Sequence, residues 1–230
     1  MPGRVTAAPT GGSGRRGRYR TNVFNRDGAE AGETAAAVDA FLADRPDDAG
    51  RVTLRPLADR EQDEFLELVA ASGDLHRPWM TLPSTPEEFQ AYLARYAQPG
   101  EESLLVCLRS TGAIAGLVNI NSIIRGRFQN GSLAYAAFAP TAGQGYMTEG
   151  LELVVRFAFA QLRLHRLEAQ IQPDNQASIG LVRRAGFRYE GCSPELLFID
   201  GAWRDHERWA ITNAMIDAVP ADPHPTQPQR

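Results

Sequence analysis

The sequence contains no lysine: all 24 of its basic residues are arginine. This absence excludes a lysine nucleophile, a Schiff-base mechanism and the phosphate-binding lysine of a P-loop. Apolar runs are short as well, and none approaches the roughly 18–20 residues that a membrane-spanning helix needs. No apolar segment follows the arginine-containing amino terminus, so we predict no secretory signal. We therefore expect a cytoplasmic protein without a membrane partner.

Cysteine is also scarce. Cys107 and Cys192 lie in separate strand-like apolar segments, so we expect buried, reduced thiols and no disulfide. The net charge of -4 gives the whole chain no nucleic-acid signature. Residues 1–26 differ, because they carry six arginines and no acidic residue before Asp27. This segment is either a weak RNA-contacting arm or a solvated leader.

The pattern of apolar residues predicts one folded domain over residues 51–216. Residues 1–50 should form a mostly disordered leader with one possible helix at 33–43, and residues 217–230 a disordered proline-rich tail. Strands are expected at 51–57, 103–109, 113–124, 131–139, 166–171, 187–199 and 202–212, and helices at 61–71, 85–96, 148–162 and 176–185. The fold class is α/β (α+β), with a mixed, mostly antiparallel central sheet of six to seven strands flanked by about four helices.

The turn from Ala142 to Met147 connects a predicted strand to the longest predicted helix. Glycines 143 and 145 let the backbone approach a ligand, and the first N–H groups of a helix have no intrahelical partner. The helix dipole favours negative charge there, so the turn suits a pyrophosphate. It lacks the ending of a P-loop and the third glycine of a dinucleotide fingerprint, and an ordinary strand–helix connection is the plain alternative.

The wider pattern resembles the acyl-CoA core of the GNAT N-acetyltransferases. The match is closest to the RimJ/RimL branch, the ribosomal-protein alanine N-acetyltransferases, and it spans residues 51–212. The motifs that carry it are Trp79 after Arg-Pro, GLVNINSIIRGRF at 116–128, Gly143-Gln-Gly145 with Glu149, His165-Arg166-Leu-Glu168, DNQAS at 174–178, AGFRYEG at 185–191 and FIDGAWRDH at 198–206. The resemblance implies a GNAT fold, acetyl-CoA as co-substrate, no metal, and direct attack of a primary amine on the thioester.

The resemblance also assigns the donor contacts. The pantetheine arm would add to the strand at Ala137 and Phe138, with a backbone N–H near Phe138 polarising the thioester carbonyl. Asn175 would contact the same arm. The pyrophosphate would lie on the backbone of Gly143, Gln144, Gly145, Tyr146, Met147 and Thr148. Ala142 and Met147 depart from the residues usual in this turn but remove no backbone donor.

Two positions depart from the family's usual catalytic residues. The tyrosine that protonates the leaving thiolate is replaced by Val182, so Ser178 is the expected thiolate partner, with solvent as the alternative. The usual glutamate base is replaced by Leu197. Glu195, two residues earlier on the same predicted strand face, is our candidate base. The alternatives are Glu168, Glu149, or a water held by Asn119, Asn121 or Tyr135.

The acceptor side is the least determined part of the site. Trp79, Asn119, Asn121 and Tyr135 fall in segments that line it in the family, although Trp79 is equally suited to anchor the core. The expected acceptor is the N-terminal α-amino group of a protein, of the ribosomal type. A small-molecule amine (aminoglycoside, polyamine or amino acid) and a non-catalytic acyl-CoA-binding module are the rivals. We expect a monomer or a homodimer whose core binds no nucleic acid.

Overall fold

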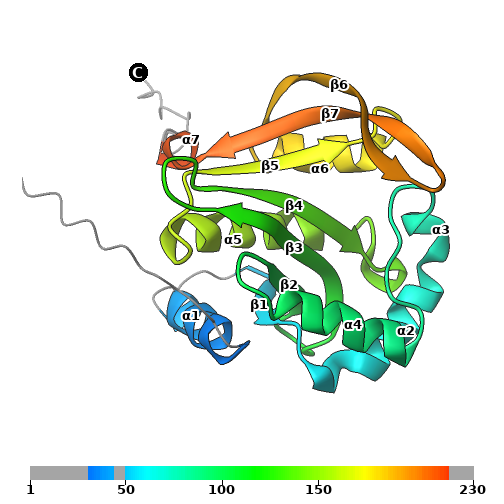
Figure 1. Ribbon diagram of the computed structural model, residues 1–230. Coiled ribbons are helices and arrows are strands. Elements are labelled where there is room, and N and C mark those ends of the chain that lie inside the picture. Colours follow the sequence, from blue (N-terminus) through cyan, green and yellow to red (C-terminus); the bar gives the residue numbers. More distant parts are fainter. Residues whose placement is uncertain (1–30, 44–49, 218–230) are drawn as a thin grey trace, which may run out of the picture.

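The computed structural model describes residues 31–43 and 50–217 of the chain. Seven strands form one sheet in the order β1-β2-β3-β4-β5-β7-β6, with β4 and β5 as its one parallel pair (Figure 1). This confirms the predicted mixed, mostly antiparallel sheet. The strands are β1 (Val52–Pro56), β2 (Glu102–Leu108), β3 (Ile114–Ile124), β4 (Asn130–Ala137), β5 (Arg166–Ile171), β6 (Arg188–Ile199) and β7 (Ala202–Thr212).

All four predicted helices are present, with ends shifted by a few residues at most. The helices are α1 (Ala31–Ala43), α2 (Gln62–Ala71), α3 (Gly73–His76), α4 (Pro86–Tyr96), α5 (Tyr146–Ala160), α6 (Gln176–Arg184) and α7 (Asn213–Asp217). α3 and α7 were not predicted, because so few residues give no readable helical period. Among the described residues, no helix is long and apolar enough to cross a membrane. The arginine-rich segment 1–26 and residues 218–230 lie outside the described residues.

Helix α1 belongs to the packed part of the molecule. Its Val38 and Phe41 are buried, and the Phe41 ring meets Phe157 of α5 edge to face at 5.8 Å. The packed chain therefore begins before residue 51, where the sequence pattern places the start of the domain. The apolar pattern that predicts a folded segment is weak in α1, because Val38 and Phe41 are its only large apolar side chains that are buried among the described residues.

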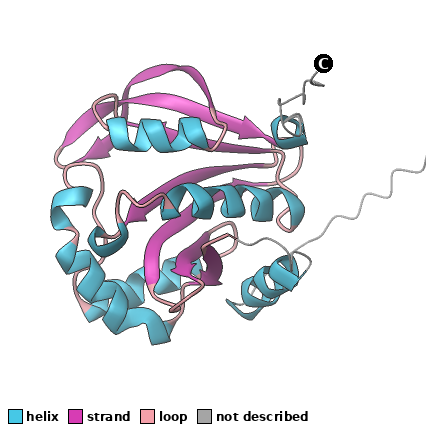
Figure 2. Cartoon of the chain, turned by 180° about the vertical axis from the view of Figure 1, so that it is seen from behind, coloured by secondary structure: helices cyan, strands magenta, loops and turns pink. Residues whose placement is uncertain are grey.

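Helices cover the two faces of the sheet unequally. On one face, α1, α5 and α6 bury an apolar cluster that includes Leu151, Phe157, Leu167 and Trp209, here called the α5–α6 cluster (Figure 2). On the other face, α2 and α4 bury a second set, the α2–α4 cluster: Leu57, Phe65, Leu82, Phe89, Leu105, Cys107, Ile114, Leu117, Ala136 and Phe138. The strand residues of this cluster come from β2, β3 and β4. Nothing from β5, β6 or β7 belongs to this second cluster within the described chain.

Strands β4 and β5 separate along their length. They pair only from Asn130–Leu133 with Arg166–Ala169, and beyond Leu133 the two strands diverge (Figure 1). The next stretch of β4 stays paired with β3 on its other side, as far as Ala137 opposite Gly116. This leaves one edge of β4 unpaired next to the turn that leads into α5.

Candidate active site

A cleft of about 620 Å³ opens at the place where β4 and β5 diverge. This volume falls within the range of small-molecule and cofactor sites. Leu75, His76, Trp79 and Met80 line one end of the cleft, and the end of β4 lines its middle. Residues of the turn 141–148 and of α6, from its N-cap Asn175 to Arg184, line the other end. One cleft thus joins the predicted pyrophosphate turn to the predicted acceptor side.

The turn end is built to hold an anion. Gly145 is the N-cap of α5 in the left-handed conformation (φ 84), and its carbonyl accepts from the amides of Thr148 and Glu149. The helical amides before Thr148 therefore have no partner in the preceding turn and are available to a ligand. Among the predicted phosphate contacts, Gly143, Gly145, Tyr146, Met147 and Thr148 line the cleft. Gln144 does not line it, and its side chain donates to the carbonyl of Pro140 at 3.1 Å.

Arginine provides the positive charge at this end. The guanidinium Nε of Arg184 on α6 lies 3.4 Å from Thr148 Oγ1, and Arg184 lines the cleft. Arg51 lies over the Tyr146 ring at 4.5 Å and is bound by Glu149, whose carboxylate accepts from its Nε at 2.7 Å. Glu149 also accepts from the Arg51 amide, so this acid ties β1 to α5 and is not free to act as a base.

Met147 has a structural partner that explains its unusual size in this turn. A Cβ placed on Gly116 of β3 would lie 2.1 Å from the Met147 sulfur and 2.7 Å from the Ala136 carbonyl. Gly116 thus makes room for the larger side chain.

The β4 amide that faces the gap is that of Ala137. In the antiparallel β3–β4 ladder, the Phe138 N–H donates to the Ala115 carbonyl at 3.2 Å. Phe138 is also fully buried in the α2–α4 cluster. Because alternate residues of such a ladder point to opposite edges, Ala137 turns its N–H and C=O away from β3. The Phe138 amide is therefore bonded within the sheet, whereas Ala137, the other residue predicted to contact the pantetheine arm, lines the cleft.

Ser178 and Asn175 lie on the α6 side of the same cleft. The Asn175 side chain caps α6 by accepting from the Ser178 amide at 3.1 Å. The hydroxyl of Tyr135 donates to the Ser178 carbonyl at 3.5 Å, and burial raises the pKa of Tyr135 above its ordinary value. Val182 lies fully buried in the α5–α6 cluster, facing away from the cleft. Asn175, Ser178 and Tyr135 thus all line the same cleft.

The structure does not bring Glu195 to the cleft. The β6–β7 register shifts between Ser193 and Leu197, and Glu195 itself has a positive φ of 48. The period-two argument that placed Glu195 on the face of Leu197 therefore fails at this bulge. Glu195 is exposed, its amide donates to Asp205, and it does not line the cleft.

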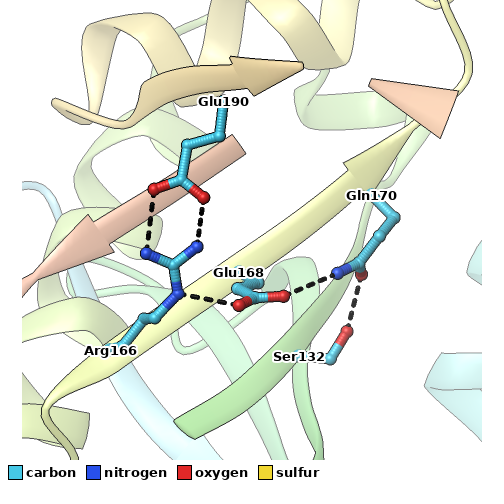
Figure 3. Close-up of polar contacts among 5 residues, drawn as sticks. All are labelled: Ser132, Arg166, Glu168, Gln170 and Glu190. Carbon is cyan, nitrogen blue, oxygen red and sulfur yellow. Dashed lines mark hydrogen bonds and ion pairs between the residues drawn. The ribbon is translucent and has the colours of Figure 1, made fainter. Parts of the chain in front are cut away.

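Glu168 lies in a polar network on the face of the sheet opposite the α5–α6 cluster, because Leu167 and Ala169 on either side of it belong to that cluster. Arg166 donates to Glu168 from Nε at 2.7 Å and binds both carboxylate oxygens of Glu190 (Figure 3). Gln170 donates to Glu168 and accepts from the Ser132 hydroxyl at 2.8 Å. The Arg166 guanidinium lowers the pKa of Glu190. Glu168 is bound by two donors outside the cleft lining, so it is poorly placed to take a proton.

Asn119 and Asn121 are not in the cleft either. Asn119 is buried and donates to the Tyr92 hydroxyl, and Asn121 accepts from the Tyr96 hydroxyl at 2.7 Å. Both tyrosines belong to α4, so these asparagines fasten β3 to that helix. Trp79 does line the cleft, and its predicted place on the acceptor side stays a prediction.

His76 is a cleft residue that the sequence did not single out. It is 7% exposed, and its Nε2 lies 2.9 Å from the Ala137 carbonyl oxygen. Its ring packs against Phe138 with centroids 5.9 Å apart. The sequence signal that could have found it is a histidine three residues before Trp79. Its contact with β4 leaves no such signal, because Ala137 lies 61 residues further along the chain.

The cysteines offer no nucleophile to this cleft. Cys107 is buried in the α2–α4 cluster, and burial raises the pKa of its thiol to about 11. Cys192 is exposed on β6, in contrast to the buried thiol expected there. Within the described part of the chain, no group of three or more His, Cys, Asp or Glu side chains is placed to hold a metal ion.

Comparison with known proteins matches the acetyltransferase (GNAT) domain to residues 51–188. The probable N-acetyltransferase YjcK of Bacillus subtilis is 31% identical over 170 residues, which cover 70% of this chain and 94% of that protein. The [ribosomal protein uS5]-alanine N-acetyltransferase of Escherichia coli is 36% identical over 99 residues, 43% of this chain and 51% of that one. The spermidine N(1)-acetyltransferase of E. coli is 27% identical over 168 residues, 71% of this chain and 87% of its own length.

Solved structures agree with these sequence matches. Mycobacterium smegmatis RimJ in complex with CoA-disulfide superposes with a TM-score of 0.63 at 26% identity. That similarity covers 71% of this chain and 82% of the other.

Proposed function

This chain belongs to the GNAT family of acetyltransferases, which use acetyl-CoA, and we propose that its acceptor is the N-terminal α-amino group of a protein. One observation carries the proposal: a single cleft joins an anion-binding helix N-terminus to an apolar end at Trp79 and Met80. A pyrophosphate fits the first end, and a peptide N-terminus fits the second. The unpaired β4 edge between them suits the amides of a pantetheine arm.

The proposed reaction transfers the acetyl group directly from the thioester to the amine, and residues of β4 and of α6 each assist one part of it. The amide of Ala137 polarises the thioester carbonyl and stabilises the oxyanion that forms when the amine attacks. Ser178 donates a hydrogen bond to the sulfur as the C–S bond breaks, assisted by the dipole of α6. Asn175 holds α6 in the orientation that presents Ser178. No covalent enzyme intermediate is required.

A protein N-terminus suits the cleft better than a polyamine does. A polyamine carries several positive charges, and its binding without acidic partners would leave those charges unpaired. In the described chain, no aspartate or glutamate lines the cleft. A peptide N-terminus brings one amine followed by backbone and side chains that can pack on Trp79 and Met80. The relatives support both acceptors, because they include a ribosomal-protein and a spermidine acetyltransferase.

The acceptor is tested by offering the purified full chain acetyl-CoA with two sets of amines and measuring free thiol. One set is peptides that begin with Ala, Ser or Met, and the other is spermidine, spermine and aminoglycosides. We expect the peptides to react at least about tenfold faster in kcat/KM, a difference of about 1.4 kcal/mol in transition-state binding. Faster turnover of any small amine would overturn the proposal. Mass spectrometry of the peptide products must place the acetyl group on the α-amine.

Replacing Ser178 by alanine is expected to lower kcat about tenfold while the affinity for acetyl-CoA changes little. The reason is that the hydroxyl acts on charge that develops on sulfur only in the transition state. Alanine is a good helix former, so α6 should be retained. Steady-state kinetics and calorimetry make the measurement, with Ser110→Ala in the exposed β2–β3 turn as control. Full turnover by the Ser178 variant would remove this residue from the mechanism.

A further inference from the structure

One side chain in the cleft is suited to take a proton from an amine near neutral pH. The described cleft lining contains four titratable side chains and no carboxylate: His76, Tyr135, Tyr146 and Arg184. Arg184 stays charged, burial raises the pKa of Tyr135, and Tyr146 lies beneath Arg51 at the phosphate end. Imidazole is the commonest proton acceptor in enzymes. His76 is therefore the remaining candidate within the cleft.

The contacts of His76 determine which ring nitrogen carries the proton. Nε2 lies 2.9 Å from the carbonyl oxygen of Ala137, and a carbonyl oxygen can only accept. Nε2 therefore donates, and in the neutral ring Nδ1 holds the lone pair. Within the described chain, Nδ1 has no hydrogen-bond partner and is not among the buried unpaired atoms, so it is open to the cleft. Packing against Phe138 fixes the plane of the ring.

The position of His76 matches the acyl end of the cleft. Its partner Ala137 is the β4 residue whose amide faces the gap, so the imidazole lies next to the expected thioester carbonyl. Leu75, Trp79 and Met80 surround the same end.

We propose that His76 is the general base of the reaction, acting through Nδ1 directly or through one water; the inference rests on the proposed acetyl transfer to an amine. The neutral amine attacks, the N–C bond forms, and the nitrogen becomes positively charged. That nitrogen passes one proton to Nδ1. The C–S bond breaks with its electron pair on sulfur, the thiolate takes a proton from solvent, and the imidazolium returns its proton to solvent.

Few charges surround this imidazole. Asp74 and Arg77, on the same stretch of chain, are both exposed. The groups packed against the ring, the backbone of β4 and Phe138, carry no charge. Tyr135 on β4, Tyr146 on α5 and Arg184 on α6 are the other ionisable groups that line the cleft from other elements.

His76→Gln tests the proposal, because a glutamine amide can still donate to the Ala137 carbonyl but has no basic nitrogen. We expect kcat/KM for the peptide acceptor to fall about 100-fold near neutral pH, with CoA affinity unchanged. The deficit should shrink above about pH 8, where a peptide amine loses its proton without help. His165→Gln, at an exposed histidine outside the cleft, is the matched control.

Two results would overturn the proposal. The first is a His76→Gln variant within about threefold of wild type from about pH 6 to 9, which is far below the usual effect of a lost general base. The second needs no variant: nitrogen NMR of neutral His76 that finds the proton on Nδ1. Wild-type protein that acetylates no peptide would instead refute the proposed function, so the two failures are distinguishable. Calorimetric binding of CoA confirms that the variant is folded.

Discussion

Replacing Gly143 by aspartate is expected to weaken CoA binding about 100-fold. The new carboxylate would stand at the turn where we place the pyrophosphate, and two like charges about 4 Å apart near a protein surface repel by about 4 kcal/mol. Part of this repulsion is relieved by rotation of the side chain, so we expect about 2.7 kcal/mol, or 100-fold, in Kd. Isothermal titration calorimetry with CoA measures the effect directly.

Gly112 supplies a closely matched control for this substitution. Gly143 and Gly112 have φ values of 75 and 76, and neither would bring a new Cβ within 4 Å of another atom. Aspartate therefore causes similar backbone strain at both positions, about 1–2 kcal/mol. Only Gly143 lies in the cleft; Gly112 lies in the β2–β3 turn. Equal CoA affinity in the two variants would refute the placement of the pyrophosphate.

Replacing Phe138 by alanine is expected to lower the free energy of unfolding by about 3–5 kcal/mol, the usual cost of truncating a fully buried phenylalanine. Phe138 is 0% exposed, and its ring meets Phe65 edge to face at 5.8 Å. It connects α2 to the last residues of β4, and it also supports the His76 ring. Urea denaturation followed by circular dichroism gives the change in free energy.

The same truncation at Phe198 is the control, because that side chain is 62% exposed on β6. Phe198→Ala should change the unfolding free energy by no more than about 0.5 kcal/mol. A Phe138→Ala variant that loses less than about 1.5 kcal/mol would show that the α2–α4 cluster can collapse around the missing ring.

Local patterns predicted most of the fold. Strand β5 was predicted at its observed bounds because Leu167, Ala169 and Ile171 alternate with polar residues on a regular ladder. The start of α4 was equally readable: Thr85 accepts from the Glu88 amide, and Pro86 follows it. In both cases the signal, an alternation of apolar residues or a helix cap, lies within the element itself.

The misplaced site residues share one physical cause, which is that their position depends on distant segments. Glu195 was assigned a face by counting residues, and a bulge against β7 broke the count. Asn119 and Asn121 were expected in the cleft, but their side chains form hydrogen bonds with Tyr92 and Tyr96 of α4 instead. His76 becomes a site residue only because α3 packs against β4. None of these contacts leaves a periodic trace in the sequence.

The two ends of the cleft rest on different hydrophobic clusters. Tyr146 and Met147 of the turn pack on the α5–α6 cluster, whereas Met80 packs on the α2–α4 cluster on the opposite face of the sheet. Mutations that reshape one layer should leave the other largely undisturbed, since distant sites contribute independently to stability. If the proposed assignment of the two ends is right, substitutions in α2, α3 and α4 should change the choice of acceptor while CoA affinity is kept.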